Sequence, residues 1–255
     1  MGSWIGHVSP GMLFLVVGLH MLTRSSVSGW GENFASLVDE KMMIFICIGT
    51  ALGPIGEYWA PHGAWLHMVH HDIMYASHCL FGVADLIERR GFLNSGTSAI
   101  FLIAAVVVEG ILFAGHPAKS VLEDRLHFFL VVADFICAAF IAAWVRAQTR
   151  SWAMVVAFSV CYKGSMFLAI AFTVYPSGAP GIDKEAWADY MAHVRETTHA
   201  ATHEMNMRAH IIACCLLIAW VVVFGCTQRG RSAKYDVVAI DNVEPEVVGD
   251  QAVGG

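Results

Sequence analysis

Apolar residues in this chain are gathered into long runs that are separated by short polar links, and this pattern decides the fold class. Most runs are close to the roughly 17–25 residues that an α-helix needs to cross a bilayer. Only 14% of the 255 residues are charged, whereas soluble domains carry roughly 25%. The sequence therefore predicts an all-α integral membrane protein in a lipid bilayer. Its net charge of −6 gives no reason to expect nucleic acid as a partner.

Seven such runs predict a seven-transmembrane-helix bundle over residues 1–226, followed by a disordered cytosolic tail over 227–255. We place Pro10 near the first turn of the first helix, where a missing N–H costs little. Turn signals such as PSGAPG at 176–181 separate the runs. The predicted helices cover residues 9–22, 41–59, 65–88, 97–115, 121–145, 152–175 and 205–226.

Lysine and arginine are distributed unequally between the two sides of this bundle. With the N-terminus outside or lumenal and the C-terminus cytosolic, nine of them fall in cytosolic segments and five in outer ones. Because cytosolic links are enriched in positive residues, we predict this orientation. Eleven of the 13 histidines then lie in the outer half or the outer links, and only His20 and His78 lie elsewhere.

The predicted third helix carries a stripe of polar side chains. His67, His71, Tyr75 and His78 recur at spacings of three and four residues, so they share one helical face. Ionisable groups are costly in a bilayer and normally face a bundle interior or a water-filled cavity. We therefore expect this face to line the inside of the bundle.

Glu109 lies in an apolar run that offers it no local partner. A buried lone carboxyl group must be protonated, paired with a cation or bound to a metal. His116 follows seven residues later on the same helical face, and histidines of other helices reach a similar outer depth. Imidazoles with a carboxylate suit zinc or iron. The predicted ligands of Zn or Fe are His71, Glu109, His116, His127 and His210. A proton-linked hydrogen-bond network of the same groups remains the alternative.

Asp134 and Lys163 lie in the middle of the predicted fifth and sixth helices. The link between these helices is short, which makes them antiparallel neighbours, and both residues are a similar distance from it. We therefore predict an intramembrane ion pair that contributes to fold specificity, with proton transfer as the alternative role.

The predicted tail contains Tyr235-Asp236-Val237-Val238. This segment fits the tyrosine-x-x-hydrophobic pattern of endocytic sorting signals, in which Tyr235 and Val238 would contact a sorting adaptor. The pattern favours the plasma membrane or the membranes of the endosomal and secretory pathway.

Short landmarks occur in a fixed order along residues 5–225. They are Gly6-His7, Pro10-Gly11, Gly18-Leu19, Glu57, Pro61, His71, Met74-Tyr75, Gly82, Asp85, Glu109-Gly110, Phe113, His116, His127, Gly164, Phe167, Pro176 and His210. In these landmarks the chain resembles the transmembrane protein 45 family of multipass membrane proteins. The resemblance implies a seven-helix architecture and no particular activity. Polar support for the predicted site is expected from His67, Tyr75, Glu57 and His7.

Three classes of function remain open on the sequence. The favoured one is a non-enzymatic membrane protein whose outer His/Glu cluster binds a metal ion or responds to pH. The second is an intramembrane zinc-dependent lipid amidase or esterase, because His-x-x-x-His occurs at 67–71 and at 199–203 and bound zinc activates water. The third is a proton-linked transporter.

Overall fold

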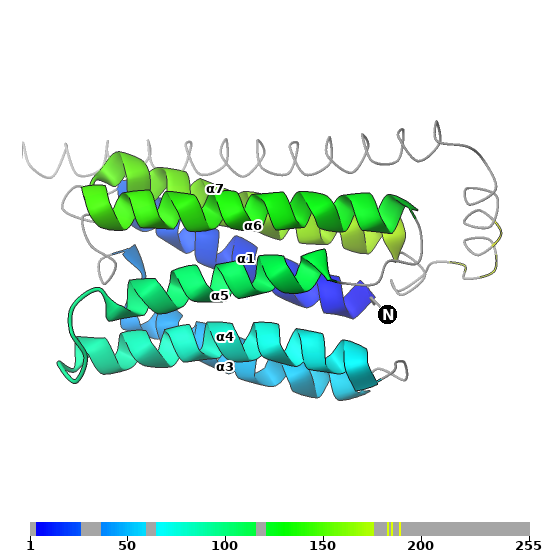
Figure 1. Cartoon of the computed structure of the whole chain (residues 1–255), viewed down its shortest axis with the longest axis horizontal. Coiled ribbons are helices and arrows are strands. Elements are labelled where there is room, and N and C mark those ends of the chain that lie inside the picture. Colours follow the sequence, from blue (N-terminus) through cyan, green and yellow to red (C-terminus); the bar gives the residue numbers. More distant parts are fainter. Residues whose placement is uncertain are drawn as a thin grey trace, which may run out of the picture. The chain divides into compact units, whose positions relative to one another are not determined.

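The computed structural model describes residues 4–26, 37–59, 65–115 and 121–175, together with Asp183, Glu185 and Asp189. The chain divides into two compact units, Met1–Ile218 and Ala219–Gly255, and all described residues belong to the first. These residues contain six α-helices and no strand (Figure 1). The helices are α1 (Trp4–Ser26), α3 (Glu40–Trp59), α4 (Trp65–Arg89), α5 (Thr97–Ala114), α6 (Val121–Ala147) and α7 (Arg150–Val174).

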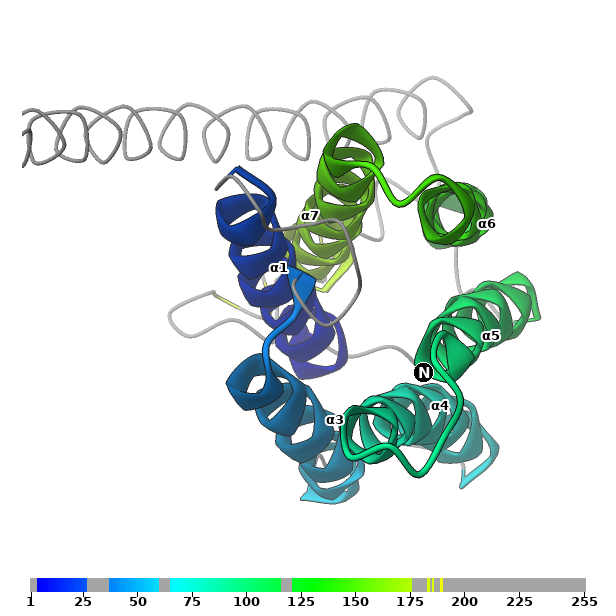
Figure 2. The same ribbon diagram turned by 90° about the vertical axis from the view of Figure 1, so that its left-hand side faces the viewer.

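The six described helices form a closed ring in chain order, which Figure 2 shows from one end. Each helix packs against its neighbours in the sequence, and α7 closes the ring by packing along α1. Successive helices run in opposite directions, so each end of the ring collects alternate helix termini. We name the two ends after residues that lie there: the His7 end, where α1 begins, and the Arg89 end, where α4 terminates.

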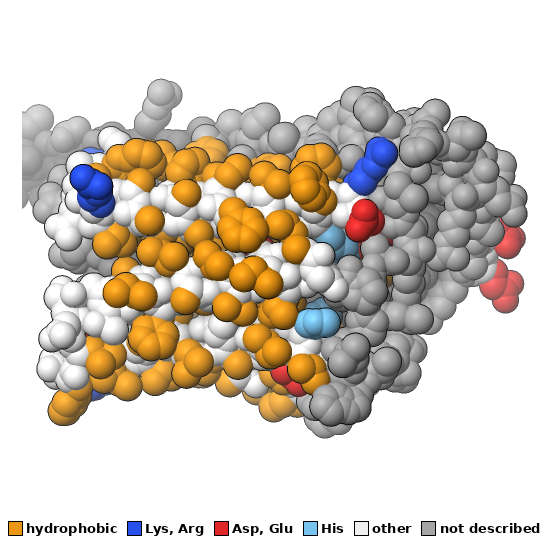
Figure 3. Space-filling model, in the orientation of Figure 1, with side chains coloured by type: hydrophobic (Ala, Val, Ile, Leu, Met, Phe, Trp, Pro, Cys, Tyr) orange, Lys and Arg blue, Asp and Glu red, His pale blue; other side chains and the backbone are white. Residues whose placement is uncertain are grey.

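Four of the described helices, α1, α5, α6 and α7, are long and apolar enough to cross a membrane. The polar residues of α4, which include four histidines and two aspartates among its 25 residues, lower its hydropathy. Large apolar side chains cover the outside of the ring, and Ile100, Phe128 and Leu80 are each more than half exposed. Figure 3 shows one such apolar face, with the visible charged side chains toward its two ends. An outside of this kind is consistent with an integral membrane protein.

The observed ends of α3 to α7 lie within two residues of the predicted ends. The first helix differs, because α1 begins at Trp4 and ends at Ser26 rather than covering 9–22. Pro10 therefore lies in the interior of α1 and not in its first turn. Trp4 packs edge-on against Phe172 of α7, with ring centroids 6.0 Å apart, and this tertiary contact favours the extra helical turn. The predicted helix 205–226 and tail 227–255 lie outside the described residues, so the seven-helix count stays a prediction.

Glycines let α1 and α7 approach each other closely. A Cβ atom on Gly164 would lie 2.7 Å from the carbonyl oxygen of Gly11 and 2.8 Å from the backbone nitrogen of Leu15. A Cβ atom on Gly18 would lie 2.6 Å from Sγ of Cys161. Small residues at helix contacts are typical of membrane proteins, because close backbone approach increases van der Waals contact. The closure of the ring therefore depends on residues that have no side chain.

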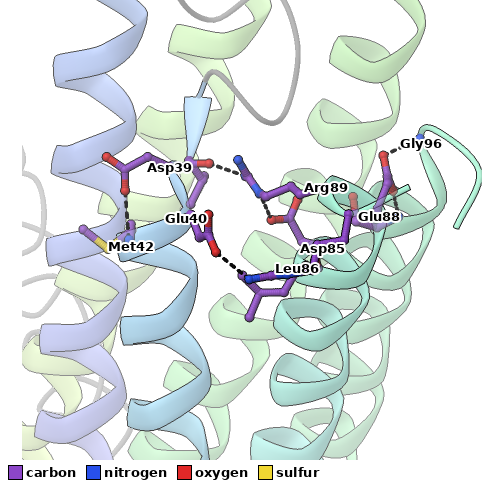
Figure 4. A network of polar contacts seen from close by, with 11 residues as sticks. Asp39, Glu40, Met42, Asp85, Leu86, Glu88, Arg89 and Gly96 are labelled. Carbon is purple, nitrogen blue, oxygen red and sulfur yellow. Dashed lines mark hydrogen bonds and ion pairs between the residues drawn. The ribbon is translucent and has the colours of Figure 1, made fainter. Parts of the chain in front are cut away.

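Charged side chains hold the Arg89 end together (Figure 4). Arg89 Nε lies 2.5 Å from Asp85 Oδ2, and Arg89 Nη2 donates a hydrogen bond of 2.5 Å to the carbonyl oxygen of Val38. Arg24 Nη1 at the end of α1 lies 2.9 Å from Asp39 Oδ2. The segment before α3 is therefore tied to both α1 and α4.

Asp39 should make the stability of the fold depend on acid pH. Partial burial works against ionisation, but the backbone N–H of Met42 and the nearby His20 and Arg24 hold the pKa of Asp39 below its ordinary 3.8. Ionised Asp39 therefore stabilises the folded chain above about pH 4, and this contribution is lost as pH falls through the folded-state pKa. Replacing Asp39 with asparagine should lower the melting temperature at pH 7 and change it much less at pH 3. An equal decrease at both pH values would contradict the assignment.

Candidate functional site

A cavity runs along the axis of the ring, and all six described helices line it. The volume open to water is about 90 Å³, and a single water needs roughly 10–15 Å³ of such space. His7 and Met21 of α1 both line it, and 14 residues of helix rise about 20 Å. The cavity thus reaches from the His7 end to Val38 at the Arg89 end, with mostly apolar walls.

Lys163 and Glu109 line this cavity, and together with Asp134 they form a cluster of charged side chains. Lys163 of α7 donates a hydrogen bond of 2.5 Å from Nζ to Oε2 of Glu109 on α5. The same Nζ lies 2.7 Å from Oδ1 of Asp134 on α6, in an ion pair that lacks hydrogen-bond alignment. All three side chains are at most 3% exposed. Lys163, the predicted partner of Asp134, therefore lies beside it. Glu109 provides a second carboxylate that contacts Lys163.

His78 of α4 completes what we call the Lys163 cluster: Lys163, Glu109, Asp134 and His78. The Nδ1 atom of His78 lies 3.0 Å from the carbonyl oxygen of Met74. Because a carbonyl oxygen can only accept a hydrogen bond, Nδ1 carries the proton and is the donor. Nε2 then bears a lone pair when the ring is neutral. This atom lies 3.4 Å from Oε2 of Glu109 and makes no hydrogen bond within the described part of the chain. Two acceptors therefore face each other unless a proton lies between them.

The charges of the Lys163 cluster do not balance in their ordinary ionisation states. One lysine ammonium faces two carboxylates, and a neutral His78 leaves a net charge of −1. An uncompensated charge in a low-dielectric interior is expensive, and such groups bind a proton or a counter-ion instead. The unpaired Nε2 of His78 offers a place for that proton beside Glu109. The cluster therefore has the composition of a site that holds one exchangeable proton.

Helix depth explains why these residues meet. Glu109 lies 12 residues after the first residue of α5, Asp134 lies 13 before the last residue of α6, and Lys163 lies 13 after the first residue of α7. Because consecutive helices are antiparallel, these positions share one level of the ring. Equal depth predicted the pairing of Asp134 with Lys163, whereas Glu109 was predicted to join the outer histidines. The same count on α5 would have found the third member.

A second polar group lies at the His7 end. Nε2 of His7 on α1 lies 3.5 Å from Nε2 of His127 on α6. The Nδ1–H group of His127 donates a hydrogen bond of 2.8 Å to the carbonyl oxygen of Glu123. Tyr175, directly after α7, donates its hydroxyl to the buried carboxylate of Glu123. Burial and this carboxylate raise the pKa of Tyr175 well above its ordinary value, so the hydroxyl keeps its proton.

Aromatic rings fix the orientation of both imidazoles. Phe113 stacks on His127 with ring centroids 5.5 Å apart. His7 packs against Tyr175 at 4.8 Å and against Phe167 at 6.1 Å. Both histidines are only 2% exposed. The two Nε2 atoms are therefore held facing each other by their surroundings.

The remaining predicted site residues have different positions. His71, Tyr75 and His78 line the cavity together, on the face of α4 that their spacing predicts. The side chains of His67 and Glu57 lie outside the described part of the chain, as do His116, His210, Tyr235 and Val238. Among the described residues, no three His, Cys, Asp or Glu side chains form a group that could hold a metal ion. The predicted five-residue metal set thus stays a prediction, and its member Glu109 is engaged by Lys163.

A known protein family matches part of this chain. Residues 95–228, more than half of the chain, match the model of a family described as a family of unknown function, DUF716. The chain belongs to the DUF716 family. The part that matches DUF716 contains α5, α6 and α7, and with them Glu109, Asp134 and Lys163. His7, His71 and His78 precede that part. Both polar groups are therefore built by DUF716 helices and the helices before them.

Proposed function

We propose that this DUF716 protein is a non-enzymatic, proton-linked multipass membrane protein in which the Lys163 cluster binds and releases one proton from the central cavity. The observation that carries this proposal is the contact between Nε2 of His78 and Oε2 of Glu109, two acceptors 3.4 Å apart. A proton between them removes both the repulsion and the net charge of the cluster. Uptake and release of that proton at mid-depth is what a proton-linked transporter or a pH-responsive membrane protein requires.

The wider setting of the proposal is a seven-helix protein of the transmembrane protein 45 type, with its N-terminus outside or lumenal and its C-terminus cytosolic. In this orientation the His7 end faces the outside. The salt bridges of the Arg89 end then face the cytosol, in agreement with the positive-inside tendency. Membranes of the cell surface or of the endosomal and secretory pathway expose the outer side to changing pH, which suits a proton-binding cavity. A sorting adaptor that binds Tyr235 and Val238 would direct the protein there.

The proposal predicts proton movement that depends on Glu109. The full chain is reconstituted into liposomes that contain a pH-sensitive dye, and a potassium gradient with valinomycin supplies the membrane potential. We expect wild-type protein to acidify or alkalinise the interior according to the sign of the potential. Replacing Glu109 with glutamine should reduce the initial rate at least tenfold. The glutamine leaves Lys163 paired with Asp134, so the cluster is neutral without an exchangeable proton.

Replacing Glu40 with glutamine provides the matched control, because this carboxylate is about half exposed and pairs with Arg90 at the Arg89 end. This variant should keep the wild-type rate. Infrared spectra of wild-type protein provide a second measurement, in which Glu109→Gln should alter the signal of a buried carboxyl or imidazolium group. Equal proton rates in wild type and Glu109→Gln, with unchanged infrared spectra, would refute the proposal.

A further inference from the structure

The facing imidazoles of His7 and His127 have the separation of two ligands on one metal ion. Zinc–nitrogen distances of about 2.0–2.1 Å in a tetrahedral site place two ligand nitrogens about 3.3–3.4 Å apart. The two Nε2 atoms here are 3.5 Å apart. A hydrogen bond between them is the other arrangement that this distance allows, with Nε2 of His7 donating to the lone pair of His127.

The surroundings of His127 fix which of its ring nitrogens carries the proton. A histidine that binds a metal through Nε2 usually donates its Nδ1 proton to a carbonyl or carboxylate, which fixes the tautomer and raises the basicity of the ligand. His127 does this toward the carbonyl oxygen of Glu123 at 2.8 Å. Its Nε2 atom therefore bears the lone pair of the neutral ring and lies 3.5 Å from Nε2 of His7. The same tautomer also accepts a hydrogen bond from His7, and the metal-binding measurement decides between the two arrangements.

One of the two proposed ligands, His7, borders the cavity. His7 and His71 both line it, and His71 lies within electrostatic range of His127. Water or a further side chain can complete the coordination, because the cavity has room for several water molecules. Imidazole ligands suit zinc and copper among the divalent metals. Zn²⁺ would also place positive charge beside the buried carboxylate of Glu123.

We propose that His7 and His127 bind a divalent transition-metal ion, Zn²⁺ or Cu²⁺, through their Nε2 atoms at the His7 end of the cavity. This site differs from the five-residue set predicted from the sequence, because it includes His7 and excludes Glu109. On binding, the Nε2 proton of His7 moves to its Nδ1 atom or to solvent, and both lone pairs face the metal. The site is separate from the Lys163 cluster and does not depend on proton exchange there.

Direct metal binding by the full chain tests the proposal. Detergent-purified, metal-free protein is dialysed against Zn²⁺, and the bound metal is measured by elemental mass spectrometry. We expect one Zn²⁺ per chain, with an affinity at least tenfold lower in His7→Phe and in His127→Phe. Phenylalanine keeps the ring contacts with Phe113, Phe167 and Tyr175 and removes the ligand nitrogens. Replacing His20 with phenylalanine, at the Arg89 end, is the matched control and should bind Zn²⁺ like wild type.

A spectroscopic measurement on wild-type protein keeps the proposal testable if a variant does not fold. Electron paramagnetic resonance of the Cu²⁺-loaded chain should show hyperfine coupling to at least two imidazole nitrogens. Zn²⁺ binding of unchanged affinity in folded His7→Phe and His127→Phe would overturn the proposal. So would wild-type protein whose bound Cu²⁺ has fewer than two nitrogen ligands, or which binds neither metal at concentrations up to the millimolar range.

Discussion

Replacing Lys163 with methionine should lower the free energy of unfolding by about 3–5 kcal/mol, because it leaves two carboxylates buried without their cation. Lys163 contacts both Glu109 and Asp134, and all three side chains are at most 3% exposed, so bulk water solvates the two remaining carboxylates poorly. The change is measured by reversible unfolding of the purified chain in mixed micelles.

Removing the carboxylates as well should restore most of that stability. The triple variant Glu109→Gln, Asp134→Asn, Lys163→Met has no buried charge, so its loss should be much smaller than that of Lys163→Met alone. A double variant that changes only Asp134 and Lys163 should lie between them, because Glu109 remains unpaired. Arg90→Gln breaks an exposed ion pair with Glu40 and should cost about 1 kcal/mol or less. Additive losses across the three cluster positions would contradict the cluster.

The second large effect is expected at the crossing of α1 and α7. Replacing Gly164 with alanine should cost about 1–3 kcal/mol, and valine more, since overpacking forces the surrounding structure to move. The atoms that a new Cβ meets, the carbonyl oxygen of Gly11 at 2.7 Å and the nitrogen of Leu15 at 2.8 Å, belong to the backbone of α1 and cannot rotate away. Melting temperature and the yield of monodisperse protein measure the effect.

Gly49 provides the control for that substitution. It also lies inside a helix, α3, but a Cβ there would meet only side-chain atoms of Leu13, at 3.4 and 3.8 Å. Alanine should be tolerated at Gly49 and should even stabilise α3 slightly, because alanine has the higher helix propensity. If Gly49→Ala and Gly164→Ala lost equal stability, the close backbone approach of α1 and α7 could not be the cause.

The two polar groups relate differently to the functions that the sequence left open. The Lys163 cluster supports a proton-linked role. One bound proton would neutralise its net charge of −1 and would lie between the two acceptors, Nε2 of His78 and Oε2 of Glu109. The His7–His127 pair supports metal binding at a different depth. A zinc-dependent amidase or esterase would need a catalytic metal with an open position beside a lipid-sized groove. Zn²⁺ bound at His7 and His127 would therefore justify a screen of lipid amides and esters.

Helix positions could be predicted from the sequence because the bilayer acts on each segment separately. A run of apolar residues near 20 in length indicates a span whatever its neighbours are, which is why the ends of α5 were predicted within one residue. The early start of α1 could not be predicted in this way. It depends on Trp4 meeting Phe172 of α7, a contact between residues far apart in the chain.

The order of residues along the chain establishes which segments are apolar enough to form spanning helices and which polar residues need partners inside the bundle. The stripe on α4 and the common depth of Asp134 and Lys163 follow from helical periodicity and segment length alone. The Asp134–Lys163 pairing was predicted in this way, but the partners of Glu109 and His7 depend on the tertiary structure. Glu109 meets Lys163, and His7 meets His127, because the helices pack around one ring with these side chains turned toward each other. The rotation of each helix about its axis depends on packing between distant segments, which helical periodicity does not specify.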